Sequence, residues 1–166
     1  MLVTTIGSSS GCSTSLRDSA GVYIQSSKNT LLDCGEGVNK FFLQRDVDEL
    51  DAVCITHAHL DHFIGLPMLL FHNLAIRGRT KPLTIIAPAD VGLFIDKFYT
   101  YYHLRPEFTI NRKYYRASDI DNQWLFGDVY IIPYEPLPIF SIFSKKTFNF
   151  NSDKSLKYNI VYLAVF

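Results

Sequence analysis

The sequence predicts a mixed α/β fold in which helices pack against a β-sheet. Between residues 2 and 132, short β-like apolar runs alternate with segments whose apolar residues recur at helical spacing. A histidine-rich motif directly follows one of the predicted strands, where ligand-binding loops are commonly found. The chain has 166 residues, of which 48% are hydrophobic, and it shows no internal repeat, so we expect a single core of ordinary size.

Strands are expected near the N-terminus of the chain. Residues 2–6, 21–25 and 30–33 are short apolar runs, and the polar residues 26–29 predict a turn between the last two. The Gly/Ser-rich segment at residues 7–15 is expected to be a loop. It lacks the Gly-Lys-Ser/Thr ending of a P-loop, so it is only a weak indication of a phosphate site.

Helices and strands then alternate along the chain. The first is a short helix with its apolar face at Val38, Phe41 and Phe42, followed by a strand at 51–56. A helix with apolar residues from Leu66 to Leu74 comes next and stops at Gly78, and a strand at 82–88 follows it. The last elements are a helix with apolar residues from Val91 to Tyr102 and strands near 108–110 and 128–132. From Phe140 onward the sequence becomes polar, and it ends in an apolar run at 160–166. That run is expected to be either a final strand or an exposed end.

A cluster of potential metal ligands follows the predicted strand at 51–56. It reads His57-Ala58-His59-Leu60-Asp61-His62 and contains three of the five histidines of the chain. Imidazole nitrogen and carboxylate oxygen are usual zinc ligands, and alternate residues of an extended segment point to the same side. The Asp61–His62 pair can then turn toward a second ion, and ions about 3.5–4 Å apart stabilise both the attacking and the leaving oxygen in ester hydrolysis. The alternative interpretation is a solvated polar loop.

Charge and cysteine content restrict the classes of partner and compartment. Sixteen basic and sixteen acidic residues give a net charge of zero, so composition does not favour a nucleic-acid-binding protein. The local basic clusters at 77–81 and 112–116 are better explained as solvated faces.

Cys12, Cys34 and Cys54 form no Cys-x-x-Cys motif, which predicts free thiols in a reducing, cytoplasmic environment, with Cys54 buried. The sequence contains no signal peptide and no apolar run of about 18 residues, so we expect no membrane segment.

The histidine motif and its surroundings resemble the metallo-β-lactamase superfamily. More narrowly, they are similar to ribonuclease Z, the endonuclease that trims the 3′ end of precursor tRNA. The similar segments are residues 31–37, 55–67 and 77–85, with a looser match at 15–20. The resemblance covers roughly residues 2 to 91 and implies a metallo-β-lactamase-like αββα sandwich. This chain would contain its N-terminal half in a domain at residues 1–140, followed by a divergent polar and apolar tail at 141–166.

The resemblance also implies roles for individual residues of the motif. His57 and His59 would hold one zinc ion, and Asp61 and His62 would hold the other. Asp61 would in addition orient the attacking water and take its proton, and the substrate would be precursor tRNA. Asp33 would not bind the metal itself but would contact the other ring nitrogen of a ligating imidazole and so fix its tautomer. The alternative for Asp33 is a turn residue ahead of Gly35.

The ligand set in this sequence is expected to be incomplete. The motif supplies two ligands for each ion, whereas catalytic zinc usually keeps three protein ligands and a water. The resemblance implies a further histidine just after residues 129–133, but the sequence there has Glu135 and Pro136, and no histidine follows His103. Glu135 is a possible substitute. We therefore expect one or two weakly held zinc ions and an enzyme of doubtful activity.

Three explanations for the missing ligands remain open. The chain can be the N-terminal part of a longer nuclease, a short protein completed by a second copy in a homodimer or by a partner chain, or a noncatalytic metal-binding module. Two alternative functions also remain. One is another metallo-β-lactamase-fold hydrolase that acts on a small ester or phosphodiester. The other is an interaction module whose surface aromatic residues, Tyr99, Tyr101, Tyr114 and Tyr115, bind a partner.

Overall fold

A six-stranded mixed sheet is the centre of the structure. The computed structural model describes residues 1–116, 124–126, 129–134, 139–144 and 160–163. The sheet order is β1-β2-β3-β4-β5-β6, where β1 to β3 pair antiparallel and β3 to β6 pair parallel. The strand bounds are β1 Leu2–Gly7, β2 Gly21–Gln25, β3 Thr30–Leu32, β4 Ala52–Cys54, β5 Leu83–Pro88 and β6 Ile110–Tyr115.

A second, antiparallel sheet contains the described strands of the C-terminal part. Its order is β10-β9-β8-β7, with bounds β7 Trp124–Phe126, β8 Val129–Tyr134, β9 Ile139–Ser144 and β10 Ile160–Leu163. The apolar run at 160–166 was expected to be either a final strand or an exposed end. It contains the strand β10, in which Ile160 pairs with Phe143 of β9. Strand β9 crosses residue 140, and the division into a domain at 1–140 and a tail at 141–166 stays a prediction.

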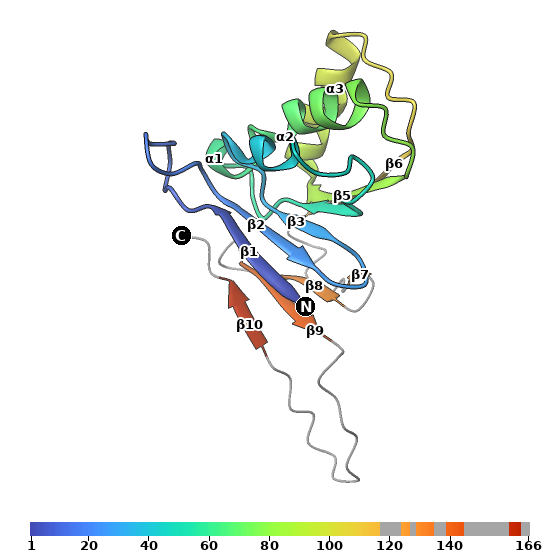
Figure 1. Ribbon diagram of the computed structural model, residues 1–166. Coiled ribbons are helices and arrows are strands. Elements are labelled where there is room, and N and C mark those ends of the chain that lie inside the picture. The colour runs from blue at the N-terminus through green and yellow to red at the C-terminus, as the bar shows by residue number, and fades with distance from the viewer. Residues whose placement is uncertain (117–123, 127–128, 135–138, 145–159, 164–166) are drawn as a thin grey trace.

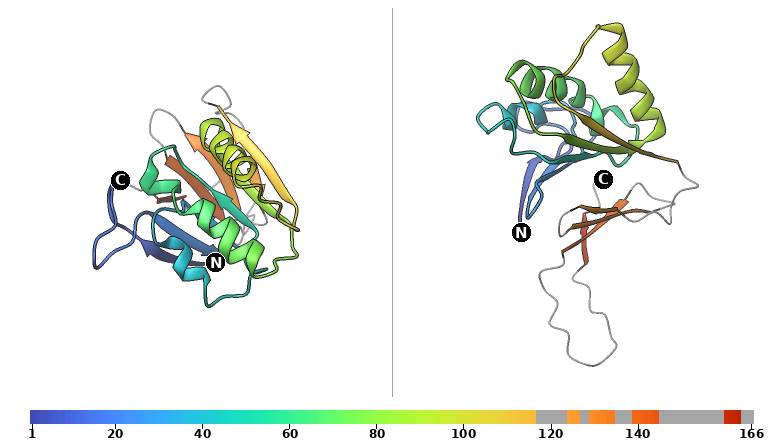
Figure 2. Two further views of the ribbon diagram at one scale, coloured as in Figure 1. Left: turned by 90° about the horizontal axis from the view of Figure 1, so that it is seen from above. Right: turned by 90° about the vertical axis from the view of Figure 1, so that its right-hand side faces the viewer.

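The helices lie on one face of the six-stranded sheet, and the second sheet lies on the other side (Figures 1 and 2). The structure therefore has a layer of helices followed by two layers of sheet. These correspond to three of the four layers of the expected αββα sandwich. The helical bounds are a 3₁₀ helix η1 at Val38–Phe42, α1 Leu60–Phe63, α2 Leu66–Met68, a π-helix η2 at Leu69–Ile76, and α3 Ala89–Tyr101. In the part of the chain that the structure describes, none of these is long and apolar enough to cross a membrane.

The central strands are buried on both faces. Tyr23, Leu31 and Ile85 belong to the cluster packed with the helices, whereas their neighbours Ile24 and Ile86 are equally buried but lie outside that cluster. Successive side chains of a strand point to opposite faces, so the second set faces the side on which the second sheet lies. Cys54 is fully buried, as predicted.

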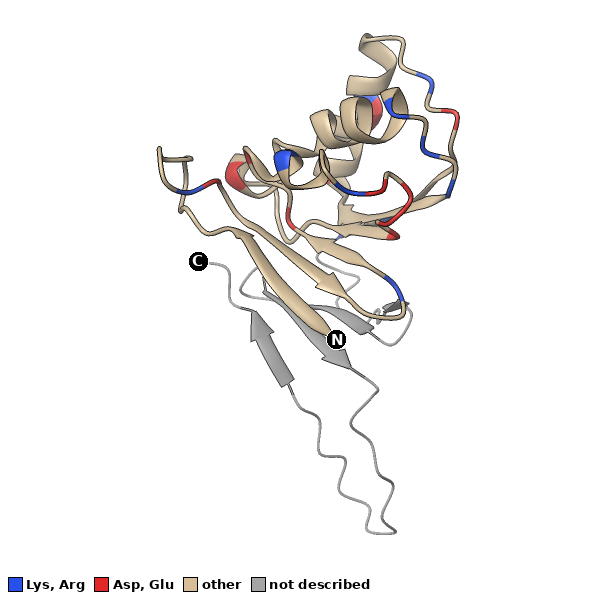
Figure 3. Cartoon of the chain, viewed as in Figure 1, with Lys and Arg blue, Asp and Glu red and all other residues tan. Residues whose placement is uncertain are grey.

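The basic cluster at 77–81 has a structural role that the sequence analysis did not predict. Arg79 is 2% exposed and donates hydrogen bonds to the carbonyl oxygens of Val47, Leu50, Lys81 and Pro82. The solvated-face interpretation is therefore wrong for Arg79, because its guanidinium joins the loop before β4 to the loop before β5. Elsewhere, basic and acidic positions lie interspersed over the helical side and its loops (Figure 3).

The strand expected near 108–110 is longer and lies later than predicted. Strand β6 begins at Ile110, ends at Tyr115 and forms the edge of the six-stranded sheet. Residues 111–113 are exposed and polar. An edge strand with exposed residues lacks the apolar pattern from which strands are predicted, which explains the difference.

Asp48 provides a test of how the loop before β4 is held. Its carboxylate accepts hydrogen bonds from the backbone N–H groups of Thr80 and Lys81 and from the Thr80 hydroxyl. Led by the hydrogen bond from Lys81, these donors lower the pKa of Asp48 to about 2. Because the pKa in the folded state is below the ordinary aspartate value of 3.8, this stabilisation is present above that value and is lost as the pH falls toward 2.

We therefore predict that Asp48→Asn lowers the free energy of unfolding at pH 7 by about 1 kcal/mol. The difference from the wild type should shrink as the pH falls from about 4 toward 2, because the wild-type carboxylate becomes protonated. Urea denaturation at several pH values measures it. Glu107→Gln is the matched control, since Glu107 is exposed. An equal loss of stability in the control, or a difference that does not depend on pH, would contradict this account.

Candidate metal centre

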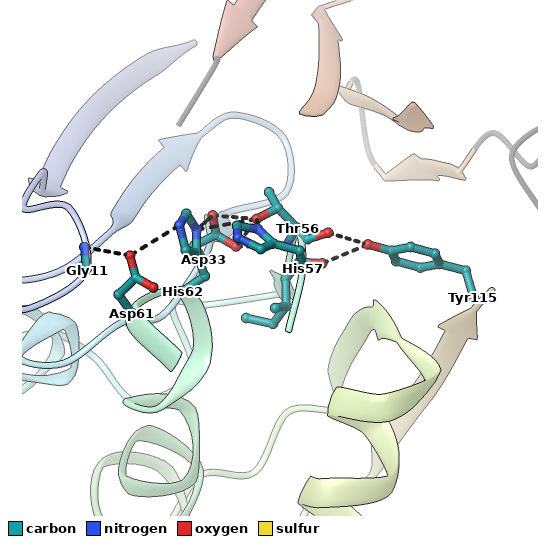
Figure 4. A network of polar contacts seen from close by, with 8 residues as sticks. Gly11, Asp33, Thr56, His57, Asp61, His62 and Tyr115 are labelled. Atoms are coloured by element: carbon teal, nitrogen blue, oxygen red, sulfur yellow. Dashed lines mark hydrogen bonds and ion pairs between the residues drawn. The ribbon is translucent and has the colours of Figure 1, made fainter. Parts of the chain in front are cut away.

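The motif residues lie where the C-terminal ends of parallel strands meet. Strand β4 ends at Cys54, two residues before Thr56, and Asp33 directly follows β3. Parallel strands place their carboxyl ends at the same edge of a sheet, so residues far apart in the sequence come together there. Figure 4 shows Asp33, Thr56 and His62 converging at this edge, with Asp61 beside them.

Asp33 is a fully buried carboxylate with several hydrogen bonds. Its Oδ1 accepts the backbone N–H of Thr56 at 2.7 Å, and the Thr56 hydroxyl lies 2.9 Å from both carboxylate oxygens. Its Oδ2 lies 2.8 Å from Nδ1 of His62. Burial raises the pKa of Asp33, and the bonds from His62 and Thr56 oppose that effect. The residue also has a φ of 57°, in the left-handed region where few non-glycine residues occur.

The contact with Asp33 determines how the His62 ring is presented. An ionised carboxylate can only accept, so Nδ1 of His62 carries the proton and Nε2 is left free. That Nε2 lies 3.5 Å from Oδ2 of Asp61. Burial lowers the pKa of His62, but the hydrogen bond and the charge of Asp33 outweigh it and raise the pKa overall.

His57 and His59 complete the group of three rings. The His57 ring centroid is 4.0 Å from that of His62 and 4.5 Å from that of His59, and its Nδ1 is 2.9 Å from the Thr56 hydroxyl. Burial, followed by the neighbouring His62 and His59, lowers the pKa of His57 to about 4. His57 is therefore neutral near pH 7, which is the form of imidazole that binds metal ions.

The Gly/Ser loop contacts Asp61, a role that the sequence analysis missed. The backbone N–H of Gly11 donates to Oδ2 of Asp61 at 2.9 Å, and Gly11 has a φ of 76°. Burial alone would raise the pKa of Asp61, but the Gly11 bond and the charge of His62 lower it. A short glycine-rich run shows only that a loop is present, so nothing in the sequence pointed to this contact.

Of the four tyrosines proposed as a partner-binding surface, Tyr99 is buried, Tyr114 and Tyr115 are half-buried and Tyr101 is exposed, so the expectation of surface exposure is wrong for Tyr99, and partner binding stays a prediction. The Tyr115 hydroxyl lies 3.0 Å from the Ile55 carbonyl oxygen and 2.9 Å from that of Thr56, so it supports the start of the motif (Figure 4). Tyr99 is 7% exposed, whereas Tyr101 is 77% exposed. Packing of α3 and the edge strand β6 therefore buries Tyr99 and covers Tyr114 and Tyr115 in part, which the sequence pattern did not show.

The donor types at this edge fit zinc, but the described residues do not complete a site. Imidazole nitrogen and carboxylate oxygen are suitable ligands, and the bonds to Asp33 and Thr56 engage Nδ1 of two rings. Among the described residues, however, no three histidine, cysteine or acidic side chains are arranged to hold one ion. Glu135 and Pro136, where a further ligand was expected, lie outside the described residues.

Comparisons with known proteins show which family this chain is similar to. A family model described as anti-Pycsar protein Apyc1 matches residues 1–95. Ribonuclease Z of Clostridium tetani is 38% identical over 96 residues, which is 56% of this chain and 30% of that protein. Ribonuclease Z of Clostridium novyi is 30% identical over 145 residues, which is 78% of this chain and 46% of that protein. The chain thus spans less than half the length of these curated relatives.

Solved structures agree on the fold. The short form of human tRNase Z superposes with a TM-score of 0.62 at 22% identity, covering 86% of this chain and 57% of that one. The metallo-β-lactamase fold protein YhfI of Bacillus subtilis gives 0.64 at 25% identity, covering 84% and 57%. The expected metallo-β-lactamase fold is therefore confirmed, and the chain covers only part of it.

The Asp33–His62 contact predicts a specific tautomer. In Asp33→Asn, the amide group can turn its NH₂ toward Nδ1 of His62, and a ring that accepts there must carry its proton on Nε2. We predict that histidine ¹⁵N spectra at pH 8 show Nδ1–H for His62 in the wild type and a shift toward Nε2–H in the variant. His72, which lies outside the motif beside Asn73, is the internal control. An unchanged His62 spectrum would contradict the proposed control of this ring by Asp33.

Proposed function

Because this chain belongs to the family described as anti-Pycsar protein Apyc1, and is a ribonuclease Z-like member of the metallo-β-lactamase superfamily, we propose that its histidine motif forms part of a zinc-dependent phosphodiesterase centre. The observation that carries the proposal is the bond between buried Asp33 and His62, which leaves Nε2 of His62 free beside Asp61. His57 and His59 would hold one ion, and Asp61 and His62 would hold the other.

The residues of this chain would divide the work as follows. Two zinc ions, when bound, would supply positive charge to the phosphate and promote ionisation of the attacking water. Asp33 keeps the proton of His62 on Nδ1. The N–H of Gly11 holds Asp61 in place, and Asp61 would orient the attacking water and accept its proton. The hydroxyl of Tyr115 supports the backbone from which the motif begins.

Precursor tRNA is the substrate that we propose first. The curated relatives that match the chain are ribonucleases Z, which supports cleavage of a phosphodiester bond near the 3′ end of that RNA. The chain spans 30% and 46% of these two proteins, and among its described residues no three potential ligands are grouped to hold one ion. We therefore propose that the chain by itself is weakly active or inactive, and that ligands from a second copy or a partner chain would be needed for full activity.

A small phosphodiester is the alternative substrate. The matching family model is described by a protein that is not named as a ribonuclease, and this chain has no net charge. A protein that binds a long polyanion usually gains affinity from many basic contacts, which a small substrate does not require.

The three cysteines are free, and this supports the proposed reducing, cytoplasmic location.

Zinc content tests the proposal directly. We predict that the purified, unchelated chain carries one or two zinc ions by plasma mass spectrometry. His59→Ala should lose most of this zinc, because it removes a ligand from the exposed side of the motif. His72→Ala is the control, since it removes an exposed imidazole outside the motif. Equal zinc in the wild type and His59→Ala would contradict a metal site at these residues.

Cleavage assays on the same preparations test the substrate. A precursor tRNA and a model phosphodiester should both be cleaved slowly, well below about 1 s⁻¹, because the ligand set is incomplete. A thioester and a lactone serve as negative substrates. Turnover of precursor tRNA at an ordinary enzymatic rate would contradict the incomplete set, and preferential turnover of the lactone or thioester would contradict phosphodiester chemistry.

A further inference from the structure

The hydroxyl of Thr56 lies between the Asp33 carboxylate and the ring of His57 (Figure 4). Its oxygen is 2.9 Å from both carboxylate oxygens of Asp33 and 2.9 Å from Nδ1 of His57. Nδ1 of His62 is farther away, at 3.4 Å, and has its own bond to Asp33 at 2.8 Å. The hydroxyl therefore connects the buried carboxylate to a second ring of the motif, which is not the ring that Asp33 itself contacts.

The surroundings of Thr56 keep this hydroxyl in place. Thr56 is 6% exposed, its backbone N–H donates to Oδ1 of Asp33 at 2.7 Å, and its carbonyl oxygen accepts the hydroxyl of Tyr115 at 2.9 Å. A β-branched side chain is also restricted in its rotation about the Cα–Cβ bond. The main chain on both sides of the side chain is thus held, and little water can reach the hydroxyl in place of these partners.

The number of available protons determines the direction of each hydrogen bond. A hydroxyl has one proton to donate, whereas an ionised carboxylate can only accept. The Thr56 proton must therefore be directed to Asp33, because two oxygens 2.9 Å apart without a proton between them repel each other. The Thr56 oxygen is then left as an acceptor toward His57. An imidazole that meets an acceptor through Nδ1 must carry its proton on that nitrogen.

The proton of His57 can occupy either nitrogen, so the Thr56 contact decides between two forms. Burial, followed by the neighbouring His62 and His59, lowers the pKa of His57 to about 4, so the ring is neutral at pH 8. With the proton on Nδ1, Nε2 is an unprotonated nitrogen that can bind a metal ion. The rings of His57 and His62 have centroids 4.0 Å apart, and both would then present the same nitrogen.

We propose that Thr56 is a positioning residue that passes the influence of Asp33 on to His57. The carboxylate accepts the Thr56 hydroxyl proton, the hydroxyl accepts the Nδ1–H of His57, and Nε2 of His57 is left unprotonated, as it is in His62. The benefit for metal binding rests on the proposed function, but the proton positions follow from the described residues alone. Substituting a residue that orients a metal ligand weakens metal binding about 10–100-fold.

Histidine ¹⁵N spectra of the chelator-treated protein at pH 8 test the proton position in the absence of metal. His57 should show Nδ1–H in the wild type. Thr56→Val keeps the shape of the side chain but removes the hydroxyl, so Nδ1–H of His57 loses its acceptor and the Nε2–H form should gain population. His62 should stay Nδ1–H in that variant, because its own bond to Asp33 remains. Thr56→Ser keeps a hydroxyl and should give the wild-type spectrum.

Zinc titration of the same samples measures the consequence for the metal site. Thr56→Val should raise the Kd for zinc about tenfold, and Thr56→Ser should not. Thr30→Val is the matched control, since Thr30 is 1% exposed and its hydroxyl has no hydrogen-bond partner among the described residues. It removes an equally buried hydroxyl from β3 and should leave both the His57 spectrum and the Kd unchanged.

The wild-type spectrum decides the proposal even where Thr56→Val does not fold, because Nε2–H at His57 would overturn it outright. It is also overturned if folded Thr56→Val keeps Nδ1–H at His57, or if Thr56→Ser or Thr30→Val moves the proton as Thr56→Val does. Nδ1–H at His57 in a wild-type chain that binds no zinc would contradict the proposed metal centre and still support this role of Thr56.

Discussion

The buried carboxylate of Asp33 is the constraint on which the geometry of the histidine motif depends. It follows β3, accepts hydrogen bonds from Thr56 beyond β4, and contacts His62 in α1. A carboxylate without solvent exposure is costly unless its oxygens are hydrogen-bonded. The two strand ends and the helix must therefore meet in one arrangement to satisfy it. That arrangement also fixes which nitrogen of His62 faces Asp61.

Close backbone contact keeps this arrangement rigid. The N–H of Cys34 donates to the His62 carbonyl oxygen at 2.7 Å, and that of Gly65 donates to the Cys34 carbonyl oxygen at 2.9 Å. A Cβ on Gly35 would lie 2.0 Å from the carbonyl oxygen of Asp61, far inside normal contact distance. Only glycine lets the loop after β3 touch the backbone of α1 at this point. The position of the motif is thus fixed both by the Asp33 carboxylate and by contacts between main-chain segments.

Much of the fold was predictable because the spacing of apolar residues within each strand or helix is a local property of the sequence. Strands β2, β3 and β5 and helix α3 were predicted close to their observed bounds, since central strands and a packed helix carry apolar residues at regular spacing. Strand β6 was placed too early because it is an exposed edge. The helix expected from Leu66 to Gly78 is instead α2 followed by the π-helix η2, and apolar spacing alone does not distinguish these forms.

The sequence by itself determined the fold class and the set of possible metal ligands, because His57 to His62 are consecutive and their chemistry is visible without coordinates. Only the tertiary structure decided what holds them. Asp33 contacts His62 across 29 residues, Gly11 contacts Asp61 across 50, and Tyr115 contacts Thr56 across 59. No local period encodes such contacts. They arise because parallel strands place distant segments at the same edge of the sheet.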